Sequence, residues 1–318
     1  MSRRAVLPRM VDRFQDYGRG VVKISLSGLD TEEQETREHI AHFSEVVKTA
    51  VTAKDFKPPM LPEVVIRLSE MVNKTDVSIK EVEGAVVRDP TVAARIVAVA
   101  NSVFYSRGAS VRSLKEAIMR LGLAEVRDVA FQAVAKTTIF RAPGFSDRMR
   151  ELFDAAQAAG LFARQICKIL KFQSESAYLC GLLHDMGEAI ILGVAVPRAK
   201  DSKPLTPVEK EALLAAVQLY HAQIGAMVAS MWGLPEMVCD AVLHHHNPHK
   251  SENPSQMALV TAVADLLLTH VGLGVPQRTI LPLQEPLFYQ LNLSSRDVEG
   301  LLKYAEEVIE NRDSLDPS

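Results

Sequence analysis

A histidine and an aspartate stand side by side at His184 and Asp185, in the segment YLCGLLHDMGEAIIL. An imidazole nitrogen and a carboxylate oxygen on adjacent residues can bind neighbouring metal ions when other segments supply further ligands. The doublet alone is a weak signal, because such pairs also occur by chance. The alternative interpretation is a structural histidine that hydrogen-bonds to the backbone, with Asp185 capping a helix.

Other residues could complete a metal site. His221 lies in a long apolar segment, two histidines end the segment AVLHHHNP, and Asp265 lies in the apolar segment LVTAVADLLLTH. Asp265 needs a partner there, because burying an unpaired carboxylate is costly. If these segments are packed helices, we predict that one polar cluster in their interior contains His184, Asp185, His221, His245, His246 and Asp265.

The elements that position these residues are predicted to be helices. Apolar residues recur with a period near 3.6, and no long run alternates with period two. Helix-start signals occur at Ser78 with Glu81, Asp89 with Pro90, Ser113 with Glu116, and Thr206-Pro207 with Glu209. We therefore predict an all-α fold with helices near 31–53, 61–73, 79–87, 90–100, 114–120, 122–138, 147–170, 175–192, 208–231, 235–246, 255–271 and 295–310. One short strand is expected within residues 21–29.

The helix that begins after Thr206 is predicted to be central. Its small residues Ala222, Gly225, Ala226 and Ala229 form one face that lets another helix approach closely, and larger apolar residues form a second face. The chain's one tryptophan, Trp232, follows as an expected core anchor before a helix stop and restart at Gly233-Leu234-Pro235.

The composition sets limits on function. The chain has 318 residues, of which 47% are apolar and 24% charged, which fits one large domain with extensions or two modest ones. Its 36 Lys and Arg against 39 Asp and Glu argue against generic nucleic-acid binding. A mild basic cluster (Arg107, Arg112, Lys115 and Arg120) is interpreted as a solvated face. Three cysteines without a CxxC pair, no signal-peptide apolar region and no apolar run of about 20 residues predict a cytoplasmic protein without a membrane span.

The ordered motifs of the chain resemble the HDOD family, the "HD-related output domain" of bacteria, a relative of the HD and HD-GYP phosphohydrolases. PPMLPEVVIRLSEMV resembles the opening helix, and SLKEAIMRLGLAEVRDVA resembles the family's helix pair around an LG dipeptide. GLLHDMGEAIIL, LYHAQIGAMVASMWGLPEMV and AVLHHHNP follow in the family's order. VVRDPTVAARIVAVANSVFY resembles the family's DP…NS motif. The residues that carry these motifs outside the HD cluster are Asp89, Pro90, Asn101, Ser102, Tyr105, Gly122, Trp232 and Pro235.

The resemblance implies an HD-type multi-helix bundle with an N-terminal helical sub-bundle and flanking helices. We assign residues 1–54 to an N-terminal extension and residues 55–272 to the HDOD domain. Within the domain, residues 55–140 form the sub-bundle and residues 141–272 the HD-like bundle. Residues 273–318 form a linker, a helix and a tail that is expected to be disordered.

Departures from the catalytic relatives bear on function. HD phosphohydrolases carry a metal-binding histidine one helix before the doublet, where this chain has Ala155. Glu188 replaces a lysine that often follows the doublet, Asn247 replaces a glutamate after the histidine pair, and no GYP sequence follows. Loss of a ligand weakens a two-metal site and its chemistry. We therefore expect no enzymatic activity and no cofactor, with weak divalent-metal binding at His184, Asp185 and Asp265 as the exception.

Three functional hypotheses follow. The first is a non-catalytic signalling protein that acts through protein–protein interaction; the resemblance implies a pathway linked to motility, virulence or a second messenger. The second is a metal-dependent phosphohydrolase that acts on a nucleotide or cyclic dinucleotide. The third is a nucleotide sensor without turnover, in which Arg164, Lys168 or the histidines bind phosphate. A homo-oligomer is compatible with all three.

Overall fold

The computed structural model describes residues 31–53, 56–102, 105–106, 108–172, 174–199, 205–250, 255–273 and 286–311. Every regular element in these ranges is helical, which confirms the predicted all-α class. The strand expected within residues 21–29 and the tail expected to be disordered lie outside the described residues.

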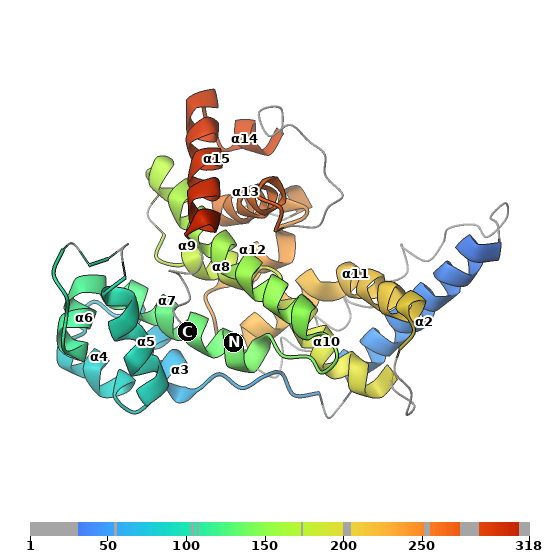
Figure 1. Ribbon diagram of the computed structural model, residues 1–318, viewed down its shortest axis with the longest axis horizontal. Helices are drawn as coiled ribbons and strands as arrows, with labels where there is room; N and C mark the ends of the chain where they lie inside the picture. Colours follow the sequence, from blue (N-terminus) through green and yellow to red (C-terminus); the bar gives the residue numbers. More distant parts are fainter. Residues whose placement is uncertain are drawn as a thin grey trace.

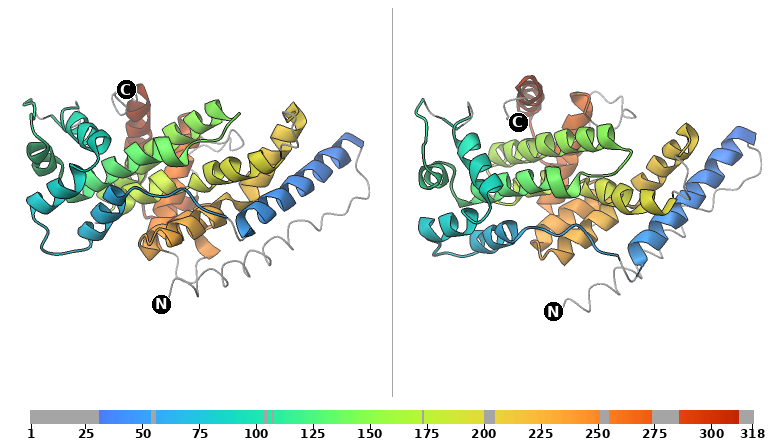
Figure 2. Two further views of the ribbon diagram at one scale, coloured as in Figure 1. Left: turned by 90° about the horizontal axis from the view of Figure 1, so that it is seen from below. Right: turned by 60° about the horizontal axis from the view of Figure 1, so that its bottom comes forward.

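The helices form three groups (Figure 1). One end of the molecule is the N-terminal sub-bundle: α3 (Glu63–Val72), α4 (Ile79–Val86), α5 (Pro90–Ala100), α6 (Leu114–Leu121) and α7 (Leu123–Val134). The centre contains α8 (Ser146–Ile169), α9 (Ala177–Leu183), α12 (Glu236–His244) and α13 (Gln256–His270), covered by α14 (Pro286–Gln290) and α15 (Ser295–Glu310). At the other end, α10 (Met186–Ala199) and α11 (Pro207–Met231) pack against α2 (Thr31–Thr52), which lies beside α11 in every view (Figure 2).

Side-chain caps fix several helix starts, as the sequence predicted. The Ser78 hydroxyl accepts a hydrogen bond from the Glu81 amide, and the Glu81 carboxylate accepts one from the Ser78 amide. Thr206 and Glu209 form the same reciprocal pair at the start of α11. The Asp89 carboxylate caps α5, with proline at the first helical position. These bonds satisfy amides that a helix leaves unpaired at its N-terminus.

Three local predictions differ from the structure in detail. The helix predicted over 175–192 is two helices, α9 and α10, with His184 and Asp185 at the break between them. The helix predicted over 122–138 begins after Gly122 (φ 80°), and beyond Val134 it widens into a π-helix, η1 (Ala135–Ile139). At the start of α6 only half of the expected reciprocal cap forms. The Ser113 hydroxyl accepts a hydrogen bond from the Glu116 amide, but the Glu116 carboxylate accepts one from the Arg112 amide and not from the Ser113 amide. Helical periodicity alone does not register these changes, because each alters the backbone over only a few residues.

The residues of the predicted family motifs outside the cluster are structural. The Asn101 amide brackets Val111, donating to its carbonyl at 3.0 Å and accepting from its amide at 2.7 Å. The Tyr105 hydroxyl lies 3.3 Å from Arg164 of α8. The Trp232 indole donates to the Pro59 carbonyl at 2.9 Å. Trp232 is half-buried, so it ties the end of α11 to the segment before α3 and does not sit at the centre of the core.

Small residues let the helices beside the HD doublet approach closely, as predicted for α11. A Cβ atom added to Gly187 of α10 would lie 1.9 Å from the carbonyl oxygen of His221, and one added to Gly225 would lie 2.9 Å from Val242. On the other side of the doublet, a Cβ at Gly181 of α9 would lie 2.3 Å from the carbonyl oxygen of Ala159 in α8. These contacts set the distances across which the residues of the cluster face one another.

Two segments are long and apolar enough to cross a membrane by length and composition, Ala177–Ala195 and Pro207–Met231. Within the protein, 83% of the first window and 72% of the second are buried. Their apolar character is therefore accounted for by packing in the protein core.

Candidate metal centre

The six residues predicted to form a polar cluster come together, although they lie on four different segments. His184 and Asp185 occupy the break between α9 and α10, and His221 lies on α11. His245 and His246 follow the last residue of α12, and Asp265 lies on α13. The helices that carry these residues pack against one another in pairs, so the tertiary fold brings the cluster together.

Three of the histidines are held in one tautomer by the backbone. The Nδ1 atoms of His184, His221 and His245 lie 2.7, 3.0 and 2.7 Å from carbonyl oxygens three residues earlier. A carbonyl oxygen only accepts, so each Nδ1 carries the hydrogen, and each neutral ring presents its Nε2 lone pair to the cluster. This is the form in which histidine binds metals, with the other ring nitrogen fixed by a hydrogen bond. The backbone-bonded histidine of the alternative interpretation is therefore compatible with a ligand role.

Asp185 lies between two sets of donors. Its Oδ1 is 3.2 Å from His221 Nε2 and 3.3 Å from His245 Nε2, while its Oδ2 is 3.2 Å from His184 Nε2. On the first side, His246 Nε2 lies 2.9 Å from His221 Nε2, so this set has four donors. On the second side only Asp265 joins, 3.7 Å from His184 Nε2. In each set the potential ligand atoms lie within 4.8 Å of one another.

The side of the cluster that contains three histidines fits a metal ion. The Nε2 lone pairs of His221 and His245 face each other at 3.3 Å, which is unfavourable for two neutral rings unless a proton or a cation lies between them. Two further buried atoms, His184 Nε2 and Asp185 Oδ1, lack a well-formed hydrogen bond. Imidazole nitrogens with one carboxylate are the donor set that zinc and other first-row transition metals prefer.

The charges of the cluster support one another. Burial alone would raise the pKa of Asp185, but the histidines around it, His184 first, hold that pKa well below its ordinary value. Burial opposes protonation of His184, yet Asp185 and Asp265 outweigh it and raise the pKa of His184 well above its ordinary value. Burial and the rings of His245 and His221 lower the pKa of His246 to about 3. Asp185 therefore stays ionised and His246 stays neutral near pH 7, whereas His184 holds a proton that a metal ion would have to displace.

The second side of the cluster lacks a donor from α8. Ala159 packs on Gly181, and Arg148 forms an ion pair with Glu188 at 2.8 Å, so α8 runs antiparallel past the doublet. Ala155 lies between these two anchors and on the same helical face, because positions seven and eleven residues apart share a face. Ala155, whose side chain is a methyl group, therefore lies on the face of α8 that passes His184 and Asp185.

An ion pair that the sequence did not predict, between Arg148 and Glu188, lies beside the cluster. Glu188, 1% exposed, accepts hydrogen bonds from Arg148 and from the Gln218 amide. Asp185 also acts electrostatically on Arg148, raising its pKa. The signal of Glu188 in the sequence is an acid in an apolar helix, which requires a buried cation from elsewhere in the chain.

The two phosphate-binding candidates on α8 lie away from the cluster. The Arg164 guanidinium pairs with Glu125 at 2.6 Å and with Asp128 at 2.9 Å, joining α8 to α7. Lys168 is in the last turn of α8, about 20 Å along the helix axis from Ala155 at 1.5 Å rise per residue. Neither residue therefore supports phosphate binding at the histidines.

The sequence profile of the HDOD domain matches residues 59–248, more than half of the chain. The chain belongs to the HDOD family. The match begins at the segment before α3 and ends after the histidine run, so Asp265 on α13 lies beyond it. The recognised domain therefore contains five of the six clustered residues.

Solved structures share the HDOD fold of this chain. An HDOD domain protein of unknown function from Geobacter sulfurreducens is 23% identical, with a TM-score of 0.68 over 87% of this chain and 99% of that chain. A protein from Marinobacter aquaeolei VT8, provisionally named a signal transduction protein, is 23% identical, with a TM-score of 0.63 over 92% of this chain and 66% of that chain. A protein from Shewanella amazonensis SB2B, provisionally named a metal-dependent phosphohydrolase, has a TM-score of 0.60 at 22% identity, over 85% of this chain and 99% of that chain.

The curated relatives that match this chain are much longer proteins. An uncharacterised protein of Treponema pallidum is 23% identical over 231 residues, which is 70% of this chain and 44% of the relative. Ribonuclease Y of Thermus thermophilus is 26% identical over 163 residues, which is 51% of this chain and 22% of the enzyme. The HDOD chain thus spans less than half of the length of these relatives.

Proposed function

We propose that this HDOD protein is a non-catalytic signalling protein whose HD cluster holds one metal ion and whose surface binds a protein partner. The observation that carries the proposal is that the two oxygens of Asp185 face donor sets of unequal size and composition. Its Oδ1 faces a set with three histidines, whereas its Oδ2 faces His184 and Asp265 alone, with Ala155 opposite.

The inequality matters because a hydrolytic centre with two ions would need both donor sets to hold one. A pair of metal ions, when bound, activates water and neutralises the phosphate. The set with His221, His245 and His246 is complete enough to retain one ion. The other set offers one imidazole and two carboxylates, one of them shared. One ion would stabilise the bundle by cross-linking α11, the end of α12 and the α9–α10 break.

The N-terminal sub-bundle supports the interaction part of the proposal. Among the described residues, five of the nine large hydrophobic side chains that are exposed lie on it: Met60, Ile66, Ile79, Val87 and Met119. Met60 is 84% exposed, and Val87 and Met119 are more than half exposed. Exposed apolar side chains concentrated on one sub-domain favour contact with a partner. The name of the Marinobacter aquaeolei relative supports a signalling role.

A metal-dependent phosphohydrolase is the second candidate. It is favoured by the carboxylate of Asp185, whose two oxygens face different donor sets as a bridging ligand would. The provisional name of the Shewanella amazonensis relative and the name ribonuclease Y agree with this alternative.

Metal content and hydrolysis separate the two candidates. We expect about one equivalent of bound transition metal, retained on dialysis, and no turnover of mononucleotides, cyclic dinucleotides or short RNA. His221→Ala is expected to lose the metal, whereas His270→Ala, a matched change at an exposed histidine on α13, is expected to retain it.

Adding a donor at position 155 is the complementary test. Ala155→His is expected to raise the metal content toward two equivalents, because it restores an imidazole opposite His184. Two equivalents of metal with nucleotide hydrolysis in the unmodified chain would refute the non-catalytic proposal. A chain that binds no metal after loading with zinc, manganese or iron would refute the metal part.

A further inference from the structure

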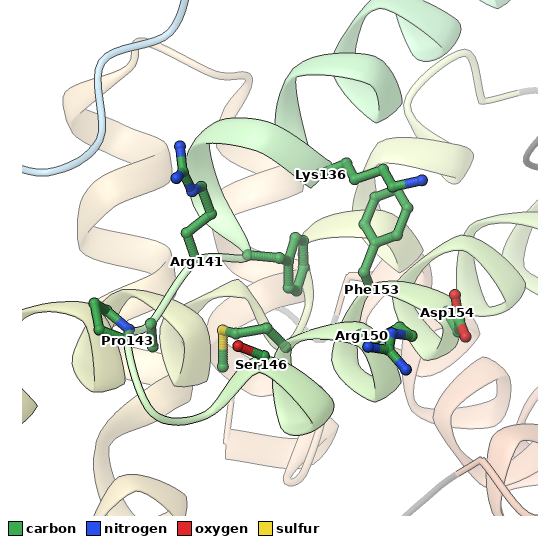
Figure 3. A pocket seen from close by; sticks show the side chains of 10 residues that line it. Lys136, Arg141, Pro143, Ser146, Arg150, Phe153 and Asp154 are labelled. Carbon is green, nitrogen blue, oxygen red and sulfur yellow. The ribbon is translucent and has the colours of Figure 1, made fainter. Parts of the chain in front are cut away.

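A cavity of about 490 Å³ lies on the other face of α8 from the HD cluster. It is lined by η1, the loop that follows η1, and the first turns of α8 (Figure 3). At 3.6 residues per turn, Met149, Phe153 and Asp154 point away from the face that carries Arg148 and Ala155. The cavity and the candidate metal centre are therefore separate sites that share one helix.

The rim of the cavity is positively charged. Lys136 of η1, Arg141 of the loop and Arg150 of α8 line it together with a single carboxylate, Asp154. Arg150 also pairs with Asp147 of the same helix at 3.5 Å, so three cations against two anions leave a net charge of +1. In Figure 3, Arg141 and Pro143 lie on one side of the cavity, and Lys136, Arg150 and Asp154 on the other. The three basic side chains are exposed, so the charged rim is open to solvent.

The floor of the cavity is apolar. Phe140, Met149 and Phe153 line it and are 5%, 4% and 4% exposed. The two phenylalanine rings meet edge to face, with centroids 5.5 Å apart, and Lys136 Nζ lies 5.9 Å from the Phe153 centroid. The volume of this cavity lies within the range of small-molecule sites.

The backbone around the cavity is also unusual. The π-helix η1 carries Lys136 and directly precedes Phe140 and Arg141. Turns of this type are rare and occur frequently at functional sites, where they alter the direction of side chains. Here η1 delivers residues of the N-terminal sub-bundle to the start of the HD-like bundle, where the two parts of the domain meet.

We propose that this cavity binds a nucleoside phosphate, with Arg141 and Lys136 contacting the phosphate and the base lying on the apolar floor. The net positive rim selects an anion, and guanidinium and ammonium groups are the usual partners of phosphate. Because the cavity is larger than a phosphate and its floor is apolar, we expect the ligand to carry an apolar ring in addition to the phosphate. This site does not depend on a metal in the HD cluster, so it can be tested separately from the proposed function.

Fluorescence titration of the full chain with mant-labelled ATP and GTP at physiological salt tests the proposal. We expect saturable binding of the labelled nucleotide. Unlabelled nucleotide should displace it readily, and inorganic phosphate only weakly. The double variant K136Q/R141Q is expected to bind at least about tenfold more weakly, because two charge-assisted contacts are lost. Ser146→Trp, which fills the cavity without changing charge, is expected to weaken binding similarly.

The matched control is R112Q/K115Q, which removes one arginine and one lysine from exposed positions outside the cavity and is expected to bind normally. Absence of saturable binding, or equal weakening in the control, would overturn the proposal. Loss of binding in His221→Ala, with the K136Q/R141Q variant unaffected, would place the nucleotide at the HD cluster and also overturn it. Equal competition by inorganic phosphate would reject the nucleoside.

Discussion

Adding one methyl group at Gly187 is expected to damage both the packing and the HD cluster. Gly187 lies on α10 two residues after Asp185, and an added Cβ would lie 1.9 Å from the carbonyl oxygen of His221 on α11. Side-chain Cβ atoms essentially never come within 3.0 Å of such an atom. The clash is with backbone, so no rotamer change relieves it, and α10 and α11 must separate by about 1.1 Å, the difference between 1.9 and 3.0 Å.

The size of the effect follows from two opposing contributions. Overpacking costs about 1–3 kcal/mol, and the upper end applies where the neighbouring atom cannot move. Alanine regains about 1 kcal/mol over glycine as a helix former. We therefore expect Gly187→Ala to lower the free energy of unfolding by about 2 kcal/mol, the difference between about 3 and about 1.

The same separation would lengthen the contact of 3.2 Å between Asp185 Oδ1 and His221 Nε2. Gly187→Ala is therefore also expected to bind less metal than the unmodified chain. The matched control is Gly300→Ala on α15, where an added Cβ meets nothing within 4 Å. That variant is expected to be more stable by about 0.5–1 kcal/mol.

Urea denaturation followed by far-ultraviolet circular dichroism and by the fluorescence of the one tryptophan measures both variants. The reasoning is refuted if Gly187→Ala unfolds within about 0.5 kcal/mol of the unmodified chain, the spread of neutral substitutions. It is also refuted if both variants are destabilised equally.

Further predictions concern helix caps, a connecting hydrogen bond and pH. Ser78→Ala removes the reciprocal pair with Glu81 and is expected to cost about 1 kcal/mol by urea denaturation. Trp232→Phe loses the indole hydrogen bond to Pro59 and is expected to cost about 1 kcal/mol, measured by circular dichroism. Burial raises the pKa of Asp128 to about 6, above the value near 3.9 of an unfolded chain, so its stabilising contribution is complete below about pH 4 and lost as the pH rises through 6. As the pH rises from 4 to 7, the free energy of unfolding of Asp128→Asn is therefore expected to fall less than that of the unmodified chain. Urea midpoints of the two proteins that change equally with pH would contradict this.

The break at His184 and Asp185 shows where prediction from the sequence fails. The apolar residues of 175–192 keep a helical period throughout, and the polar pair His184–Asp185 does not by itself distinguish a helix end from two ligands within one helix. The close contacts of Gly181 with Ala159 and of Gly187 with His221 lie on either side of the break. Those contacts join segments far apart in the sequence, and periodicity carries no information about them.

The cavity beside α8 is a second example. Lys136, Arg141 and Arg150 lie apart in the sequence, and Arg150 stands among charges of both signs, so the sequence shows no basic cluster there. The π-helix η1 and the turn before α8 bring them to one rim. Arg148 and Glu188 similarly form their ion pair only because α8 passes the doublet in an antiparallel direction.

The sequence by itself determined the all-α class, the caps at Ser78, Asp89 and Thr206, and the six residues that meet in the HD cluster. These depend on periodicity, on capping chemistry and on the need of buried polar groups for partners, all of which act within one or two turns or residue by residue. The tertiary structure alone decided that Asp185 faces two unequal donor sets and that a charged cavity lies across α8. Both depend on how helices distant in the chain approach one another, which is set by close packing rather than by local preference.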